Sequence, residues 1–195
     1  MNRVALGFRA HSGWAAYIGL AGPKDSPQIV ARGRIELCDP RIPPPFQPYH
    51  KAAEMPFRKA VEYIRHVTEQ TETFARRGIE RIAAELQPQK MKVSACSVLV
   101  GSGRALGPLE KILAAHPLIH TAEGVLFRQA IFRAAEQCCP KVMGIVEREL
   151  FAQAESKINL PRKEIDRRLA EFGRALGPPW QQDQKFAALA AWLAL

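Results

Sequence analysis

The sequence is poor in the patterns that mark secreted, membrane or thiol-dependent metal proteins. Its four cysteines form no C-x-x-C motif, and no histidine lies at zinc-ligand spacing from them. The adjacent pair Cys138–Cys139 precedes Pro140 and is typical of a helix end, with a redox or metal role as the alternative. The longest apolar run, residues 186–195, is about half as long as a bilayer span and predicts a buried core helix. The opening residues also lack the charged and then apolar pattern of a signal peptide, so we expect a cytoplasmic protein that does not interact with membranes.

What the sequence does contain is typical of a folded globular chain. Hydrophobic residues make up 47% and charged residues 24%, which excludes a disordered, collagenous or coiled-coil protein. A chain of 195 residues can bury a sizeable core without metal or disulfide support, and we expect residues 1–195 to form one domain. Lysine and arginine number 28 against 19 aspartates and glutamates, so the formal net charge is +9. This excess suits an anionic partner such as nucleic acid.

The first forty residues have the alternation of half-buried strands. In three segments, at 4–8, 16–20 and 29–37, apolar residues recur at every second position. Turn-forming residues at 12–13 and 22–27 separate these segments. The pattern predicts a three-stranded antiparallel meander, with the third strand near an edge of the sheet.

The rest of the chain alternates helical patterns with two short buried strands. Apolar residues recur at helical spacing over 57–86, which predicts one long amphipathic helix after a stiff proline-rich crossover at 39–48. Residues 93–100 and 142–146 are almost wholly apolar or small, as in parallel strands that are covered on both faces. Further helices are predicted at 108–116, where Pro117 stops the first, and at 121–137, 150–157, 162–172 and 181–195. This order predicts an α/β fold with a mixed sheet, three antiparallel strands followed by two parallel strands, and helices on both faces.

Two short segments add a family resemblance to this order of elements. The first segment is residues 4–15, VALGFRAHSGWA, in which a glycine and a hydrophobic residue lead through a small loop to a Gly-aromatic-small sequence. The second is residues 183–191, DQKFAALAA, in which an acidic residue precedes alanines and a leucine. Together with the element order, these segments resemble the ribonuclease H-like superfamily, which includes the RuvC-type Holliday junction resolvases. Resolvases of that type open with Gly-hydrophobic-Asp and end with Asp-x-x-Asp-Ala-Leu-Ala. The resemblance implies a ribonuclease H-like mixed sheet over nearly the whole chain.

The chain departs from this family at the positions that hold metal. Arg9 stands where the resemblance places the first metal-binding Asp, and a guanidinium cannot become a metal ligand. Residues 93–100 carry no carboxylate, and Phe186 replaces the second Asp of the closing pair, so that only Asp183 remains of that pair. Two-metal phosphodiester chemistry needs several convergent carboxylates. We therefore expect no metal and no cofactor, and a metal-dependent nuclease is the least expected enzyme.

Polar residues at the predicted strand ends and helix starts are the candidates for a site, because ligands bind in the crevice where parallel strands end. His120 and Glu123 are expected to open one helix a turn apart, where their side chains can touch. His11 or His120 with Glu123 or Glu147 would form a general base and its orienting partner. The candidate catalytic residues are His11, His120, Glu123, Glu147 and Asp183. The candidate anion- or nucleic-acid-binding residues are Arg9, Arg32, Arg34, Arg104 and Lys185.

The resemblance and the charge favour nucleic-acid association over catalysis. The first hypothesis is a catalytically degenerate module that holds structured or duplex nucleic acid by charge. The second is an enzyme for a phosphate- or carboxylate-bearing small ligand, in which Arg9 and Arg104 bind the anion and the His/Glu residues move protons. The third is a structural or assembly protein that contacts a partner, or a second copy, through the helix 57–86 and the proline-rich segment.

Overall fold

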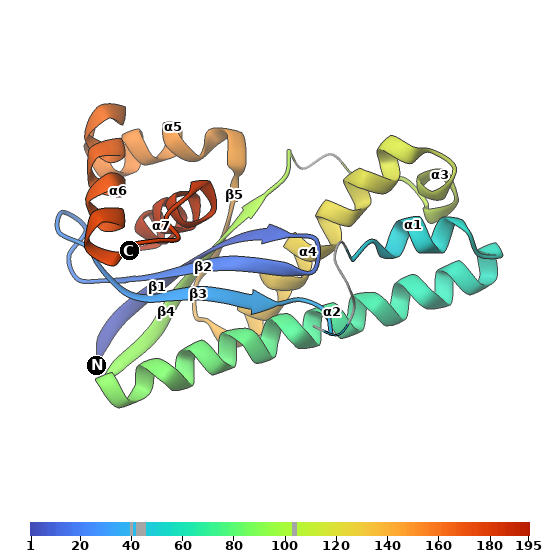
Figure 1. Ribbon diagram of the computed structural model, residues 1–195, viewed down its shortest axis with the longest axis horizontal. Coiled ribbons are helices and arrows are strands. Elements are labelled where there is room, and N and C mark those ends of the chain that lie inside the picture. Colours follow the sequence, from blue (N-terminus) through green and yellow to red (C-terminus); the bar gives the residue numbers. More distant parts are fainter. Residues whose placement is uncertain (40, 42–45, 103–104) are drawn as a thin grey trace.

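A five-stranded mixed sheet forms the centre of the protein (Figure 1), in a computed structural model that describes residues 1–39, 41, 46–102 and 105–195. The strands are β1 (Asn2–His11), β2 (Trp14–Ala21), β3 (Gln28–Glu36), β4 (Met91–Val100) and β5 (Val142–Val146). Their order in the sheet is β3-β2-β1-β4-β5, with antiparallel pairing from β3 to β1 and parallel pairing from β1 to β5. The predicted α/β arrangement of three antiparallel strands followed by two parallel strands is confirmed.

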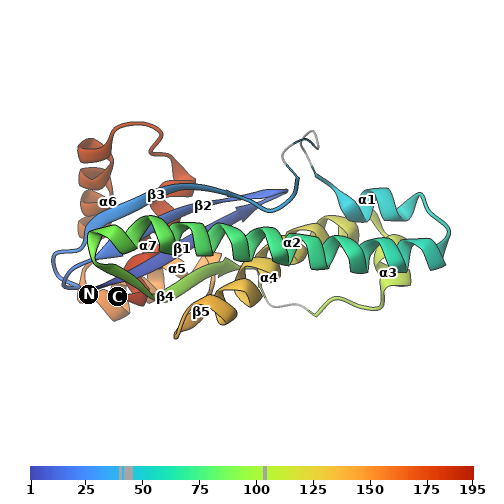
Figure 2. The ribbon, with the colours of Figure 1, turned by 90° about the horizontal axis from the view of Figure 1, so that it is seen from below.

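Helices cover both faces of this sheet. They are α1 (Pro48–Ala53), α2 (Phe57–Leu86), α3 (Leu109–Leu113), α4 (His116–Cys138), α5 (Leu150–Ala154), α6 (Arg162–Leu176) and α7 (Gln182–Ala194), with short turns η1 (Gln87–Gln89), η2 (Glu147–Glu149) and η3 (Glu155–Asn159). Figure 2 shows α2 lying along one side of the sheet, where its apolar face and that of α4 pack on Val4, Leu6 and Phe8. Helices α5, α6 and α7 form the opposite layer, against Ile18 and Leu20. No helix in the described part of the chain has the length and apolar character that a membrane span requires.

The long helix α2 follows from its amphipathic pattern. Its buried positions recur three or four residues apart, at Ala60, Ile64, Val67, Thr71, Ala75, Ile79, Ile82 and Leu86. Its outer face carries arginine–glutamate ion pairs at i,i+4 spacing, in Arg58–Glu62, Arg65–Glu69, Arg76–Glu80 and Arg81–Glu85. Exposed pairs of this kind contribute little stability in water. They leave the outer face of α2 mixed in charge, so it presents no continuous basic stripe.

The first two strands are buried on both faces, not on one face as the alternation predicted. Residues 4–8 and 15–21 are buried throughout, because α7 packs on the face of the sheet opposite α2. The backbone of α7 approaches β1 very closely at Gly7. A Cβ at that position would overlap with Ala187 O and would lie 2.5 Å from Ala191 N. At the sheet edge, β3 keeps the predicted half-exposed pattern.

Pro117 begins a helix instead of ending one. The sequence predicted separate helices at 108–116 and 121–137, and the structure has two, α3 at Leu109–Leu113 and α4 at His116–Cys138. The second helix therefore starts before Pro117 and not after it. Proline is tolerated in the first turn of a helix, because the N–H that it lacks would have no partner there. As a result, His116 and His120 lie one turn apart on the same face of α4.

The predicted proline-rich crossover at 39–48 lies largely outside the described residues, which include neither 40 nor 42–45. After it the structure contains a short helix that the sequence did not predict, α1, with Pro48 in its first turn. This helix packs against α2 and α4 and buries Tyr49 and Ala52. It thereby brings His50 next to α4.

Candidate functional site at the carboxyl edge of the sheet

The carboxyl edge of the sheet brings polar side chains from three elements together. Side chains alternate along β1, so Arg9 and His11 continue the row of Gly7, which faces α7. Because β1, β4 and β5 are parallel, their carboxyl ends lie at the same edge of the sheet. Glu147 follows β5 directly, and Asp183 lies in the first turn of α7. We call Arg9, His11, Glu147 and Asp183 the carboxyl-edge cluster.

Arg9 is the centre of this cluster. Its Nε and Nη2 donate to the two carboxylate oxygens of Glu147 at 3.1 and 2.9 Å, which makes the pair bidentate. Its Nη1 donates to Oδ1 of Asp183. The ring centroid of Phe186 lies 5.3 Å from the guanidinium carbon, within cation–π distance. The side chain of Arg9 is only 17% exposed, so these three partners replace most of its water.

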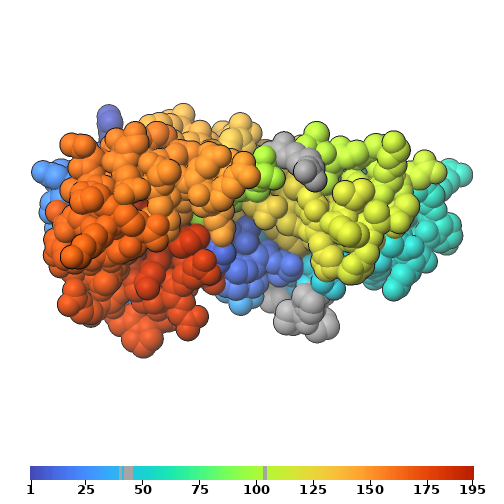
Figure 3. All heavy atoms as spheres, turned by 90° about the horizontal axis from the view of Figure 1, so that it is seen from above, coloured from blue at the N-terminus to red at the C-terminus, as the bar shows by residue number. Residues whose placement is uncertain are grey.

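His11 extends the cluster toward β2 and β3. Its Nε2 lies 2.9 Å from Oδ1 of Asp183, and because an ionised carboxylate only accepts, the imidazole is the donor. Its ring stacks on Trp14, with centroids 4.4 Å apart and planes inclined by 12°. Arg34 of β3 lies over the same indole at 4.7 Å. In Figure 3 the blue surface of β1 and β2 is exposed between the orange and red C-terminal helices and the yellow part of α4.

The charges in the cluster stabilise one another. The hydrogen bond to Glu147 raises the pKa of Arg9 and outweighs the opposing effect of burial. Burial alone would raise the pKa of Asp183, but the hydrogen bonds from His11 and Arg9 hold it below its usual range. At neutral pH the cluster therefore contains a fixed cation and an ionised aspartate in direct contact.

The lowered pKa of Asp183 predicts a loss of stability in acid. A carboxyl group whose pKa is lower in the folded chain stabilises the fold above its unfolded pKa of about 3.9, and this contribution is lost as the pH falls through the folded value. We expect the free energy of unfolding of Asp183→Asn to fall less than that of the wild type between neutral pH and about pH 3. Urea unfolding at each pH measures this difference. Asp25→Asn is the matched control and should follow the wild type, whereas identical profiles for Asp183→Asn and the wild type would contradict the prediction.

An arginine that the sequence did not single out, Arg128 of α4, lies beside the carboxyl end of β4. Its guanidinium packs against two glycines, since a Cβ at Gly101 would lie 3.1 Å from Nη2 and a Cβ at Gly124 would lie 2.8 Å from it. With Gly101 and Ser102 it lines a cavity of about 590 Å³. Burial lowers the pKa of Arg128, while the charge of Glu147 acts in the opposite direction. Gly124 inside a helical pattern is the signal in the sequence that could have pointed to this close approach.

The other predicted anion-binding residues lie apart from the cluster or at its rim. Arg32 donates to a backbone carbonyl at 2.9 Å on the exposed side of β3. Arg34 forms an ion pair with Glu36 at 2.8 Å. Lys185 is exposed in the first turn of α7, close in sequence to Asp183. Arg104 lies outside the described residues.

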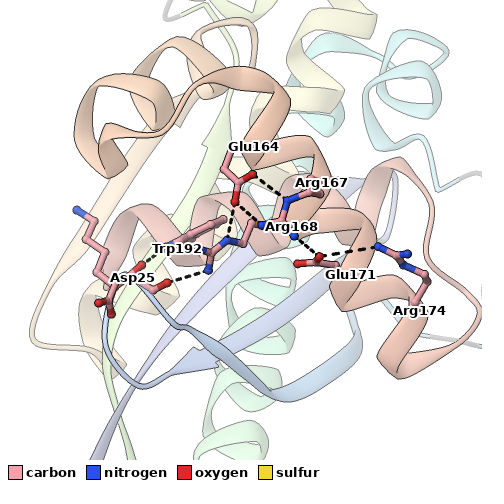
Figure 4. Close-up of polar contacts among 8 residues, drawn as sticks. Asp25, Glu164, Arg167, Arg168, Glu171, Arg174 and Trp192 are labelled. Carbon is pink, nitrogen blue, oxygen red and sulfur yellow. Dashed lines mark hydrogen bonds and ion pairs between the residues drawn. The ribbon is translucent and has the colours of Figure 1, made fainter.

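The arginines of α6 are engaged with neighbouring carboxylates (Figure 4). Glu164 accepts hydrogen bonds from Arg167 and Arg168, and these bonds hold the pKa of Glu164 at about 2. Glu171 forms ion pairs with Arg167 and Arg174. Arg168 also donates to a backbone carbonyl of the β2–β3 turn at 2.8 Å. This network joins α6 to the turn and leaves little of its charge for a phosphate.

His120 and Glu123 belong to a different group of side chains, between α1 and α4. Glu123 accepts hydrogen bonds from Tyr49 and His50 of α1. Among the residues that the structure describes, no hydrogen bond or ion pair joins Glu123 or His120 to the carboxyl-edge cluster. A pairing of His11 with Glu123, or of His120 with Glu147, would have to cross between these two groups. His11 and Glu147 do share the carboxyl-edge cluster, where Asp183 is the carboxylate that bonds to His11.

Comparison with known proteins gives a match in structure but not in sequence. No protein-family model matches the chain, and no curated protein matches it. T. thermophilus RuvC in complex with a Holliday junction substrate is similar with a TM-score of 0.53 at 10% identity, over 98% of this chain and 91% of that chain. A second structure of Thermus thermophilus RuvC has a TM-score of 0.49 at 10% identity, over 97% of this chain and 92% of that chain.

The chain has a ribonuclease H-like fold. The resemblance that the sequence suggested is thus confirmed for the architecture as a whole, including the antiparallel edge and the parallel centre of the sheet. The carboxyl-edge cluster occupies the ends of β1 and β5 and the start of α7 in this ribonuclease H-like sheet.

The side chains at this edge do not fit a pair of divalent metal ions. Arg9 bonds to both Glu147 and Asp183, and its guanidinium has no lone pair for a metal. Strand β4 contributes no carboxylate. Phe186, which stands where the resemblance places a second Asp, packs against Arg9 instead. In this ribonuclease H-like protein the positive charge between the two carboxylates comes from the chain itself.

Proposed function

We propose that this protein is a ribonuclease H-like module that binds structured nucleic acid and does not cleave it by a two-metal reaction. The observation that carries the proposal is the guanidinium of Arg9, which is bonded to both Glu147 and Asp183 at the carboxyl edge of the sheet. Two-metal phosphodiester cleavage needs carboxylates that are available to two ions about 4 Å apart. Here both carboxylates are hydrogen-bonded to one guanidinium, which belongs to the chain and keeps its charge at any physiological pH.

Cations next to the carboxyl-edge cluster support the binding of phosphates at this edge. Among the described residues Arg128 forms no ion pair, and its guanidinium lies beside Gly101 and Ser102 in a cavity. Lys185 is exposed at the start of α7. Guanidinium groups bind phosphate oxygens in a bidentate manner, and ammonium groups add point charges. The similar fold of RuvC is seen in complex with a Holliday junction substrate, which makes a four-way junction the first ligand to test.

A second basic surface lies at the amino edge of the sheet, and it can be compared with the carboxyl edge as a place for nucleic acid to bind. Arg3 of β1 and Lys92 of β4 are register partners in the parallel pair. With Lys141 they line a cavity of about 830 Å³, and no Asp or Glu is among its described lining residues. Both edges therefore carry cations, and variants at each edge distinguish between them.

Fluorescence anisotropy with labelled four-way-junction, duplex and single-stranded DNA, and with RNA, tests the binding. We expect the junction or the duplex to bind more tightly than the single strand, with an affinity that falls steeply with salt, because phosphate contacts release counterions. A dissociation constant weaker than about 100 μM at physiological salt for every ligand would be no better than generic charge attraction and would contradict the proposal.

Two matched double variants locate the interface. Arg128→Ala with Lys185→Ala removes two charges from the carboxyl edge, and Arg3→Ala with Lys92→Ala removes two from the amino edge. We expect the first to weaken binding at least about tenfold and to reduce the salt slope by about 2, as the loss of two phosphate contacts would. The second should change affinity less than about threefold. The reverse result would show that the carboxyl edge is not the interface.

Incubation of the labelled junction and duplex with the protein and Mg²⁺ or Mn²⁺ tests the second half of the proposal. We expect the strands to remain intact at protein concentrations that saturate binding. Metal-dependent cleavage that is lost in Asp183→Asn would show that the carboxylates still work in catalysis and would overturn it.

A further inference from the structure

Three histidines converge at the end of the molecule where α1 packs on α4, away from the carboxyl-edge cluster. They are His50 of α1 and His116 and His120 of α4, and one nitrogen of each lies within 4.8 Å of the others. Their ring centroids are 4.4 to 5.3 Å apart. His116 and His120 are exposed and His50 is half-buried, so the group is open to solvent.

The spacing of the two helical histidines suits a shared ligand. His116 and His120 are four residues apart on α4 and therefore lie on one face of the helix, as do the two zinc-binding histidines of an H-x-x-x-H pair. Two nitrogens that are each about 2.1 Å from one zinc ion lie no more than about 4.2 Å apart. Small rotations of the exposed side chains of His116 and His120 would bring the three nitrogens from their present separations to that range.

Glu123 is the second, independent feature of this place. Its side chain is only 6% exposed, and its Oε1 accepts hydrogen bonds from Tyr49 N at 2.8 Å and from both N and Nδ1 of His50 at 3.3 Å. The two backbone bonds satisfy the start of α1. The bond from Nδ1 fixes the tautomer of His50, because a carboxylate only accepts, and it leaves Nε2 of His50 free to bind a ligand.

The other carboxylate oxygen of Glu123, Oε2, differs from Oε1 in its surroundings. Oε2 is buried and has no hydrogen-bond partner in the described part of the chain. Burial raises the pKa of Glu123, and the hydrogen bonds from His50 and Tyr49 act against it. An unpaired buried carboxylate oxygen is costly unless a positive charge lies nearby. A cation held by the three imidazoles would supply that charge.

We propose that His50, His116 and His120 bind a transition-metal ion of the zinc class, with Glu123 as the positioning residue for His50. Imidazole nitrogens suit Zn²⁺, Ni²⁺, Co²⁺ and Cu²⁺, not the hard ions Mg²⁺ and Ca²⁺. A carboxylate that orients a metal-bound imidazole through its second nitrogen is the usual outer-shell arrangement. Three protein ligands at an exposed place leave a fourth position for water or an exogenous ligand. None of these four residues is among those that carry the proposed nucleic-acid interface.

Titration of the metal-free full-length protein with Zn²⁺, followed by calorimetry, and with Co²⁺, followed by visible absorption, tests the proposal. We expect one ion per chain and a Co²⁺ spectrum typical of four-coordinate nitrogen and oxygen ligation. His116→Ala and His120→Ala should each weaken binding at least about 100-fold, since the loss of an outer-shell partner alone costs 10- to 100-fold. His66→Ala, at an exposed histidine of α2 outside the group, is the matched control and should leave the affinity unchanged.

Glu123→Gln tests the positioning role. It keeps the size of the side chain and an accepting oxygen but removes the charge, and we expect a 10- to 100-fold weaker affinity with the Co²⁺ band positions unchanged. The proposal fails if affinity is the same in the wild type, His116→Ala and His120→Ala. It also fails if the Co²⁺ complex shows a thiolate charge-transfer band, which would assign the ion to the buried pair Cys96 and Cys139, whose Sγ atoms are 2.8 Å apart.

Discussion

Replacing Gly7 with alanine is expected to destabilise the protein by at least about 3 kcal/mol, at the upper end of what overpacking costs. The added Cβ would overlap with Ala187 O and would lie 2.5 Å from Ala191 N. Both atoms belong to the backbone of α7, so no side chain can rotate away to make room. For a chain of this length the change corresponds to a melting temperature lower by about 6 to 12 °C.

Thermal and urea unfolding followed by circular dichroism measure this effect. Gly107→Ala is the matched control, because nothing lies within 4 Å of a Cβ at that position, and its stability should stay within about 0.5 kcal/mol of the wild type. If Gly7→Ala is as stable as Gly107→Ala, α7 does not lie directly on β1. The position of Asp183 against Arg9 would then need another explanation, since α7 carries Asp183.

Arg9→Asp is expected to turn the carboxyl-edge cluster into a site whose stability depends on Mg²⁺. The substitution removes the cation between Glu147 and Asp183 and adds a third carboxylate, so without metal the like charges repel one another. Mg²⁺ prefers oxygen ligands and would replace the lost positive charge. Binding at about 100 times the dissociation constant stabilises a fold by about 2.7 kcal/mol. This is about 5 to 10 °C in melting temperature for a chain of this size.

Melting temperatures with excess Mg²⁺ and with EDTA measure the prediction. The wild type should melt at the same temperature in both, and so should Arg9→Asn, which removes the cation without adding a charge. Mg²⁺ is a suitable probe because the histidines between α1 and α4 offer it no preferred ligand. A wild-type protein that Mg²⁺ stabilises as much as it stabilises Arg9→Asp would show that the guanidinium does not occupy the place of a metal.

Much of the architecture could be predicted from local patterns. The helix 57–86 was expected with the bounds that the structure shows, because its apolar stripe persists over eight turns. The apolar runs at 93–100 and 142–146 were recognised as strands, and the structure has strands at 91–100 and 142–146. The burial of β1 and β2 on their second face was not predicted. Small residues such as Gly7 contribute little hydrophobicity, yet they are what a closely packed helix requires.

The candidate site could be predicted only in part. Arg9, His11, Glu147 and Asp183 were named from the sequence, and the structure brings them together. The sequence analysis did not name Trp14, Arg128 or the metal-binding candidates His50 and His116. Their positions depend on the close packing of α4 and on a helix at 48–53 that follows a proline-rich segment. The expectation that no metal binds was based on the spacing of the cysteines and on the missing carboxylates. These two observations give no information about histidines that meet from two different helices.

By itself the sequence determined the order of the strands and of the long helices and the absence of carboxylates from residues 93–100, because these are properties of single residues and of short-range periodicity. Only the tertiary structure decided which charges meet. Arg9 and Glu147 are 138 residues apart and Arg9 and Asp183 are 174 residues apart, so their contacts require β1, β5 and α7 to end at one edge of the sheet. Glu123 contacts His50 instead of His120 because α1 folds back onto α4. Local patterns specify which face of an element is buried, but not which distant side chain it will meet.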